Sequence, residues 1–239
     1  MSSSDPTVVD WTRLTDDPND RRAKAAVRDY IMSIRRVHTD CDLLQFIERL
    51  VAGKSVLDIG VAAHAERYLS QPEWRHGRIA KRARRCLGVD IIEPLVAELK
   101  QRGFDVVCAD ATSDRDLGER FDMVFIGDVL EHVTDATRLL RFAARHLGDS
   151  GRVFATTPNP FSRKFYRGFR RDGTAIVNLD HVCWITPTQA LEIGRRADLN
   201  LVAYHLVKKF GVGVRLLKQV AWLVQPLEYS FPDFIYEFG

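Results

Sequence analysis

Short apolar runs alternate with amphipathic segments through the middle of the chain. Helix-period patterns, such as those over residues 94–102 and 135–147, separate the runs. Apolar runs of this length joined by helices are typical of a parallel sheet that is covered on both faces. The pattern therefore predicts an α/β domain with helices on both faces of its sheet. The runs are residues 55–60, 86–91, 104–109, 121–126 and 151–156.

The N-terminal region follows a different pattern. Residues 1–20 are rich in Ser, Asp and Pro, which indicates a loose tail. Asp20 is placed to cap a helix that extends to about Val37. A second helix is expected over residues 42–51, with Gly53 as its stop signal. We expect residues 1–53 to form an N-terminal tail with helices.

The C-terminal region predicts a return to helix and strand. Thr186 and Pro187 are the cap and first-turn proline of a helix that runs to Ala197. Residues 54–239 are therefore expected to form one α/β domain. The remaining predicted elements are a strand at 199–207, a helix at 212–224 and a last strand at 231–238.

Composition and charge narrow the function classes. The net charge is only +3, and the pattern shows no nucleic-acid module, so we expect no nucleic-acid partner. The four cysteines form no CxxC pair, which argues against a zinc site or a disulfide framework. Residues 1–6 lack the apolar core of a signal peptide, and no apolar stretch approaches the length of a membrane span. We expect a cytoplasmic protein with no transmembrane span and no metal site.

Acidic and glycine residues stand at the ends of the predicted strands. In an open parallel sheet, ligands bind beyond these ends. Gly60 permits a tight turn and a close approach of the backbone to a ligand. Asp90 can accept hydrogen bonds from ribose hydroxyls, and Asp110 can accept one from an adenine amino group or cap the next helix. Asp58 lies within a strand, where a carboxylate is costly unless hydrogen-bonded, which favours a functional role.

These residues belong to motifs that resemble those of a known family. Four of them resemble the successive motifs of class I S-adenosylmethionine-dependent methyltransferases. Two later motifs resemble those of the branch of this family that is common in glycan and natural-product biosynthesis. The resemblance covers about residues 54–207. The early motifs are VLDIG at 56–60, GVDI at 88–91, ADA at 109–111 and GDVLEHV at 127–133; the later ones are TTPNP at 156–160 and DHVCWITP at 180–187.

The resemblance implies a fold and a cofactor. The fold is a Rossmann-like, seven-stranded, mostly parallel sheet with its last strand antiparallel, here with an N-terminal helical extension. The cofactor is S-adenosyl-L-methionine, with its methionine end near Asp58 and Gly60 and its sulfonium near Asp128. The usual glycine-rich turn is reduced to Gly60, because VAAH follows at 61–64. The implied cofactor-binding residues are Asp58, Gly60, Asp90, Ile91, Asp110, Ala111, Gly127 and Asp128.

The accepting group determines which further residues are needed. We expect O-methylation of a saccharide or a glycosylated metabolite, and a sugar hydroxyl needs a general base at neutral pH. His132 and His181 are the candidate bases, and either can instead be a scaffold residue. His64 and His76 lie nearer the altered turn and are expected to be structural. The alternatives are N- or C-methylation of another small molecule, or a non-catalytic methyltransferase-fold partner subunit.

Two basic segments have competing interpretations. Residues 75–85 are expected to form a solvated helix face. Residues 161–171 combine an aromatic stripe with Lys and Arg directly after the fifth strand. This second segment is either a lid helix packed on its own domain or a mobile cover whose arginines hold a phosphate-bearing acceptor. A peripheral membrane contact, helped by the apolar residues of 214–224, is a further alternative.

Overall fold

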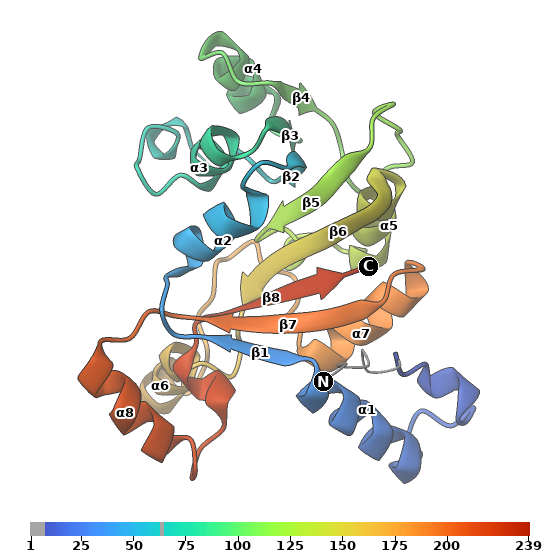
Figure 1. Cartoon of the computed structure of the whole chain (residues 1–239), viewed down its shortest axis with the longest axis vertical. Coiled ribbons are helices and arrows are strands. Elements are labelled where there is room, and N and C mark those ends of the chain that lie inside the picture. Colours follow the sequence, from blue (N-terminus) through green and yellow to red (C-terminus); the bar gives the residue numbers. More distant parts are fainter. Residues whose placement is uncertain (1–7, 63–64) are drawn as a thin grey trace.

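A twisted sheet of eight strands forms the centre of the computed structural model, which describes residues 8–62 and 65–239 (Figure 1). The strand order is β1-β7-β8-β6-β5-β2-β3-β4. Neighbouring strands are parallel except β8, which runs antiparallel to β6 and β7. The predicted Rossmann-like sheet with an antiparallel last strand is confirmed. The strands are β1 (Arg35–His38), β2 (Ser55–Ile59), β3 (Arg85–Asp90), β4 (Val106–Cys108), β5 (Phe121–Gly127), β6 (Leu147–Pro158), β7 (Leu201–Val207) and β8 (Asp233–Phe238).

Helices cover both faces of the sheet, as predicted. The buried side chains of α1, α5 and α7 pack on one face, and those of α2 and α3 pack on the other. The apolar residues of α4 pack beside β4. The helices are α1 (Arg21–Ser33), α2 (Leu43–Val51), α3 (Arg75–Arg82), α4 (Glu93–Gln101), α5 (Ala136–Arg145), α6 (Arg163–Asp172), α7 (Pro187–Arg196) and α8 (Val212–Ala221), with short 3₁₀ turns η1 (Trp11–Arg13), η2 (Glu66–Tyr68) and η3 (Leu227–Ser230).

The central strand β5 shows why consecutive residues of the predicted strands are apolar. Met123 and Phe125 pack toward α2 and α3, while Val124 and Ile126 pack toward α1, α5 and α7. All four side chains are completely buried. Because successive side chains of a strand point to opposite faces, a strand covered on both faces has no solvent-facing positions for polar residues.

The predicted first helix ends too late. Its cap is right, since the Ala23 backbone amide donates to the Asp20 carboxylate at 2.8 Å. The helix stops at Ser33, however, and Arg35–His38 form β1, which pairs in parallel with β7 and raises the strand number from seven to eight. Apolar periodicity carried the prediction to Val37, but the free backbone groups at the edge of β7 bind this segment as a strand.

The expected loose tail is ordered where the structure describes it. Asp10 caps η1, and the Trp11 indole donates to the Glu192 carboxylate of α7 at 2.9 Å. This contact attaches the segment to the α7 side of the sheet. Residues 1–7 of the expected tail, and Ala63 and His64 of the altered turn, lie outside the described residues.

Candidate active site

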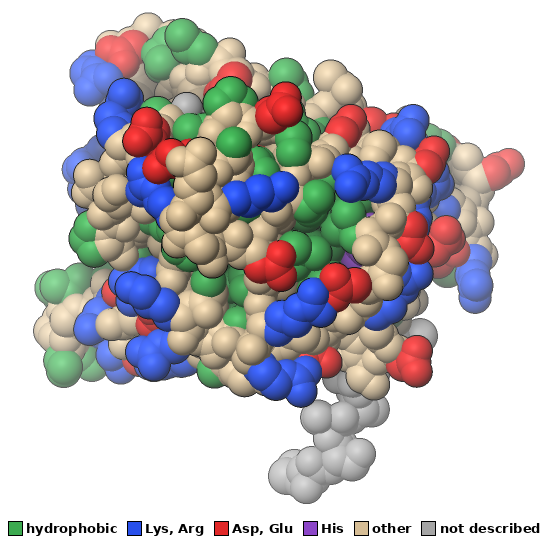
Figure 2. Space-filling model, turned by 90° about the horizontal axis from the view of Figure 1, so that it is seen from above, with side chains coloured by type: hydrophobic (Ala, Val, Ile, Leu, Met, Phe, Trp, Pro, Cys, Tyr) green, Lys and Arg blue, Asp and Glu red, His purple; other side chains and the backbone are tan. Residues whose placement is uncertain are grey.

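A cleft of about 1460 Å³ opens at the carboxyl ends of the parallel strands. It lies where β2 pairs with β3 on one side and β5 on the other, so that the chain leaves these strands in opposite directions. Among the predicted cofactor residues, seven line the cleft and Asp58 does not. On the face seen from above, Figure 2 shows Lys and Arg side chains interspersed with Asp and Glu, with hydrophobic side chains between them.

Gly60 forms the turn that brings the end of β2 against the end of β5. Its φ is +86°, and its backbone amide donates to the Val89 carbonyl at 2.9 Å. A Cβ at this position would lie 2.3 Å from Val129 Cγ2 and 3.3 Å from the Gly127 carbonyl oxygen. Only glycine satisfies both the backbone conformation and the close approach. The predicted role of Gly60 in shaping the turn therefore has a steric basis.

Asp90 presents its carboxylate to the cleft at the end of β3. Its two oxygens accept the backbone amides of Ala62 at 2.8 Å and Ile92 at 3.0 Å, which ties the turn after β2 to the end of β3. A carboxylate has about four acceptor positions, so two remain for paired hydroxyl donors. Ile91 lies beside it with 67% of its surface exposed, which leaves an apolar surface for a flat ring.

Asp110 lies in a turn at the other side of the same cleft wall. One carboxylate oxygen accepts the backbone amide and the hydroxyl of Thr112, both at 2.7 Å. These hydrogen bonds, the hydroxyl first, lower the pKa of Asp110. Residues 109–120, all of which the structure describes, contain no helix, so Asp110 does not cap one. Ala111 is buried beside it.

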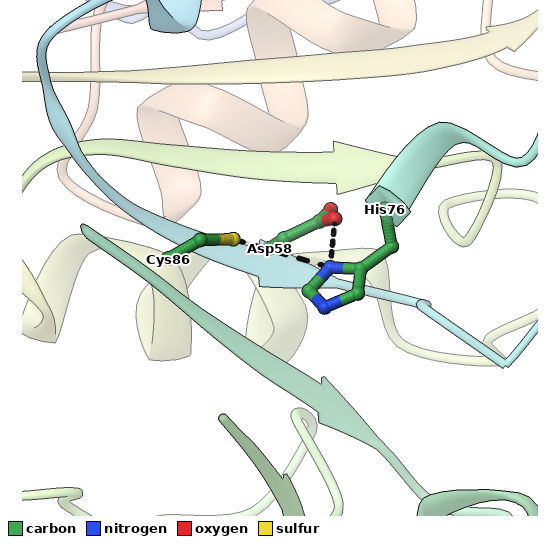
Figure 3. Close-up of side chains that lie close together, drawn as sticks. All are labelled: Asp58, His76 and Cys86. Atoms are coloured by element: carbon green, nitrogen blue, oxygen red, sulfur yellow. Dashed lines mark hydrogen bonds and ion pairs between the residues drawn. The ribbon is translucent and has the colours of Figure 1, made fainter. Parts of the chain in front are cut away.

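Asp58 points away from the cleft toward α3. Its carboxylate lies 2.8 Å from His76 Nδ1, with both side chains almost completely buried (Figure 3). Cys86 Sγ lies 3.9 Å from the same nitrogen. The hydrogen bond to His76 satisfies a carboxylate within the strand, and His76 in turn lines the cleft. The expected contact of Asp58 with the cofactor stays a prediction, which this arrangement supports only through His76.

Arg75 lies at the floor of the cleft, where the sequence predicted a solvated basic face. Its guanidinium donates to the Asp128 carboxylate at 2.8 Å and lies over the Phe125 ring. A Cβ at Gly127 would lie 2.3 Å from Arg75 Nη2, so glycine is what allows the guanidinium to pack on the end of β5. The prediction was wrong for this residue because α3 begins with it, at the helix end that faces the cleft.

The positive charge of Arg75 keeps the Asp128 carboxylate ionised. Burial raises the pKa of Asp128, but Arg75, together with hydrogen bonds from Arg75 and Thr156, outweighs burial and brings the pKa below its usual range. The Thr156 hydroxyl donates to Asp128 at 2.7 Å. Asp128 also has a positive φ of 52°, which few residues adopt as readily as Asp. Its carboxylate is therefore a fixed negative charge at the cleft.

His132 lies four residues after Asp128, in the turn that follows β5, and lines the cleft, whereas His181 is not among the lining residues. His132 Nδ1 lies 3.2 Å from the Asp180 carboxylate. The His181 ring packs edge-on against His132 with 4.6 Å between ring centroids. Asp180 is the sequence neighbour of His181, and the structure brings its carboxylate to His132.

Glu131 is a buried acid directly behind this pair. Burial, followed by the charge of Asp128, raises the pKa of Glu131 to about 8. Among the described residues, neither carboxylate oxygen of Glu131 has a hydrogen-bond donor. Glu131 lies within the GDVLEHV motif, and no role was predicted for it.

Two groups of side chains in the described part of the chain are close enough to share a metal ion. Glu131, His132 and His181 have ligand atoms within 4.8 Å of one another, and so do Asp58, His76 and Cys86. Burial raises the pKa of Cys86, so its thiol is protonated at neutral pH and is a poor ligand. The group with Glu131 is the more suitable of the two, although a cation there has to displace the Glu131 proton.

The wall of the cleft opposite α3 is formed by residues 176–180. None of residues 161–171 lines the cleft. The aromatic side chains of α6 pack on neighbouring segments instead, with Phe165 edge-on against Trp184 and Tyr166 edge-on against Tyr229. Residues 161–171 therefore pack on their own domain in this structure, as the first of the two interpretations expects, and do not cover the cleft.

Comparison with known proteins identifies the family. A family model described as a methyltransferase domain matches residues 34–204, well over half of the chain. The chain belongs to this methyltransferase family. A ubiquinone biosynthesis O-methyltransferase of Coxiella burnetii is 28% identical over 190 residues, which cover 69% of this chain and 74% of that protein.

Solved structures share the fold of this methyltransferase. An S-adenosylmethionine-dependent methyltransferase from Archaeoglobus fulgidus has a TM-score of 0.54 at 19% identity, over 82% of this chain and 90% of that one. A methyltransferase from Thermotoga maritima, described as a possible histamine N-methyltransferase, has a TM-score of 0.53 at 16% identity, over 96% and 98%. The matched methyltransferase domain and this shared fold agree with the expected cofactor, S-adenosyl-L-methionine.

The cleft of this methyltransferase fits that cofactor. The glycine at position 60 leaves the space that a Cβ would fill, and Asp90 keeps acceptor positions for the ribose hydroxyls. Ile91, Asp110 and Ala111 lie at the end of the cleft where the adenine would bind. The opposite end, with Arg75 and Asp128, has the paired charges that suit an amino acid group.

Three residues of the site escaped the sequence analysis: Arg75, Glu131 and Asp180 in its role beside His132. Arg75 could have been found from its position at the start of the first helix after the VLDIG motif. Glu131 could have been found as the acid of the GDVLEHV motif. No sequence pattern pairs Asp180 with His132, because 48 residues separate them and a loop brings them together.

Proposed function

We propose that this methyltransferase transfers a methyl group to a hydroxyl of a small molecule, with His132 as the general base. The observation that carries the proposal is the 3.2 Å contact between His132 Nδ1 and the Asp180 carboxylate at the cleft. A carboxylate in this place orients the imidazole and stabilises the imidazolium that forms on proton transfer.

The bound cofactor supplies a methyl group on a positively charged sulfur. The chain has to align the acceptor with that methyl group and remove the hydroxyl proton. When Nδ1–H of His132 donates to Asp180, the lone pair lies on Nε2, and Nε2 takes the proton from the acceptor oxygen. His181 packs against the His132 ring and limits its rotation. His181 is thus a positioning residue in this proposal, and His132 is the base.

The choice of oxygen as the accepting atom has support from the relatives. The curated relatives that match are named as O-methyltransferases. Within oxygen acceptors, the motifs at 156–160 and 180–187 favour a saccharide or a glycosylated metabolite. Methylation of an amine is the second candidate, because a free amine attacks without a strong base.

The test is turnover of His132→Ala and Asp180→Asn, measured as release of S-adenosylhomocysteine with a panel of monosaccharides, glycosides, phenols and amines. His132→Ala is expected to slow turnover on a hydroxyl acceptor by roughly 10²- to 10⁴-fold, with S-adenosylhomocysteine affinity nearly unchanged. His205→Gln is the matched control, because His205 is a buried histidine that bonds Glu237 outside the cleft. Full activity of His132→Ala on a hydroxyl, or turnover of amines alone, would rule out the proposal.

A further inference from the structure

Helix α8 turns polar side chains toward the rest of the protein and apolar side chains toward solvent. Its inner positions carry Arg215, Lys218 and Trp222, of which Lys218 and Trp222 both bond Ser230. The Trp222 ring stacks on Phe231. A surface helix normally turns its apolar stripe to the core. Here the apolar side chains point outward: Val212, Val214, Leu216, Leu217 and Val220, followed by Leu223 and Val224 after the helix, are 49–89% exposed.

The outward stripe is too extensive for scattered surface residues. Leu217, Leu223 and Val224 each expose about three quarters or more of their surface. Single exposed apolar residues are ordinary, but a contiguous stripe indicates a binding surface. Since Trp222 and Lys218 anchor the opposite side of the helix, the stripe is not part of the protein's own core. The stripe therefore requires a partner outside the chain.

Helix α6 carries positive charge close to α8. The two helices lie at the same end of the molecule (Figure 1). Lys218 of α8 lies close enough to Arg163 of α6 for the two charges to interact. The single acid in residues 161–172 and 208–225 is Asp172, which pairs with Arg171. The cations of these segments are Arg163, Lys164, Arg167, Arg170, Arg171, Lys208, Lys209, Arg215 and Lys218.

We propose that α8 and α6 form a surface that binds the interface of a lipid bilayer containing anionic lipids. Aliphatic side chains of α8 enter the boundary between headgroups and acyl chains, and the surrounding Lys and Arg side chains contact anionic headgroups. The occupant follows from charge complementarity: the apolar stripe needs a hydrophobic partner, and its basic surroundings need a negative one. No described helix is long and apolar enough to cross a membrane, so the contact is peripheral.

A second copy of the chain fits this surface poorly. In a two-fold symmetric dimer the same patch faces itself. The cations of residues 161–172 and 208–225 would then come near the same cations of the other copy, and the single acid of these segments, Asp172, is already paired with Arg171. Like charges brought together in this way oppose association. The bilayer proposal does not depend on which atom the enzyme methylates.

The test is co-sedimentation of the full chain with vesicles of phosphatidylcholine alone and of phosphatidylcholine mixed with phosphatidylglycerol. The wild type is expected to bind the mixed vesicles and to bind phosphatidylcholine at least tenfold more weakly. Replacing Leu217, Val220 and Leu223 together by Ser should reduce binding to mixed vesicles about tenfold or more. Replacing Arg167, Arg170, Lys208 and Lys209 by Gln should reduce it similarly and weaken its salt dependence.

The control replaces Leu14 and Met32 by Ser, because these exposed apolar residues lie in the N-terminal segments away from α8. This variant should bind mixed vesicles as the wild type does. Because all the substituted side chains are exposed, each variant should keep the circular dichroism spectrum and S-adenosylhomocysteine affinity of the wild type. Failure of the wild type to bind mixed vesicles, or equal binding to both vesicle types, would overturn the proposal. A dimer that Leu217→Ser, Val220→Ser and Leu223→Ser convert to monomer would also overturn it.

Discussion

Gly127→Ala is expected to separate Arg75 from Asp128. The new Cβ would lie 2.3 Å from Arg75 Nη2 and 2.4 Å from Cζ, whereas non-bonded atoms of this kind pack at about 3.5 Å. The guanidinium therefore has to move by roughly 1 Å. A movement of that size is enough to break its 2.8 Å hydrogen bond to Asp128.

The expected loss of unfolding free energy depends on how exposed the Arg75–Asp128 ion pair is. Breaking a fully buried ion pair costs about 3 to 5 kcal/mol of unfolding free energy, and an exposed pair contributes about 0 to 1 kcal/mol. The Arg75 and Asp128 side chains are 21% and 44% exposed, so solvent screens the pair in part. We expect Gly127→Ala to cost about 1 to 2 kcal/mol, between the two limits.

A double-mutant cycle isolates this effect. Arg75→Ala removes the group that the new Cβ meets, so Gly127→Ala should cost much less in that background, with a coupling of about 1 to 2 kcal/mol. Urea denaturation of the four proteins measures each unfolding free energy. Gly148→Ala is the control, because its Cβ would meet its nearest atom at an ordinary 3.6 Å. Equal costs of Gly127→Ala in both backgrounds would refute the reasoning.

Three further predictions use other parts of the structure. Burial raises the pKa of Glu131 to about 8 from its ordinary 4.5, so Glu131 stabilises the fold below pH 4.5 and this stabilisation is lost as the pH rises to about 8. In urea denaturation, the unfolding free energy of the wild type should therefore fall between these pH values by up to about 1.4 kcal/mol per pH unit, and Glu131→Gln should remove this fall. An unchanged pH dependence in Glu131→Gln would contradict the assignment. Asp90→Ala should weaken S-adenosylhomocysteine binding by about 1.5 to 3 kcal/mol in calorimetry, and unchanged affinity would place the ribose elsewhere. Asn159→Ala should lower the unfolding free energy by about 2 to 4 kcal/mol, because the buried side-chain amide makes three hydrogen bonds. Its Nδ2 donates to the Glu228 and Phe231 carbonyls, and its Oδ1 accepts the Phe161 backbone amide. A loss under 1 kcal/mol would show that these bonds contribute little.

Much of the fold could be predicted because its rules are local. Burial on both faces makes residues 123–126 of β5 continuously apolar, and the carboxylates of Asp20 and Asp42 cap the helices that follow them. β1 could not be predicted in this way. Its residues are helical in periodicity, and their strand conformation depends on β7, which lies more than 160 residues later in the chain.

The strand-end residues were predictable for a related reason. Parallel strands bring their carboxyl ends to one edge, so Gly60, Asp90 and Asp110 were expected at one cleft before any contact was known. The direction in which each side chain points was harder to predict from the sequence. Asp58 belongs to the same motif as Gly60, but its carboxylate is buried against His76 and does not line the cleft.

By itself, the sequence determined most of the elements and their order, with β1 as an exception, because apolar periodicity and capping act between residues a few positions apart. The tertiary structure decided which charges meet. Arg75 could be assigned to solvent until α3 was packed against the end of β5, where Asp128 faces it. Asp180 could be assigned to His181 until the loop after α6 placed it against His132. The range of a pairwise electrostatic contact is a few ångströms in space, and no spacing along the chain encodes that distance.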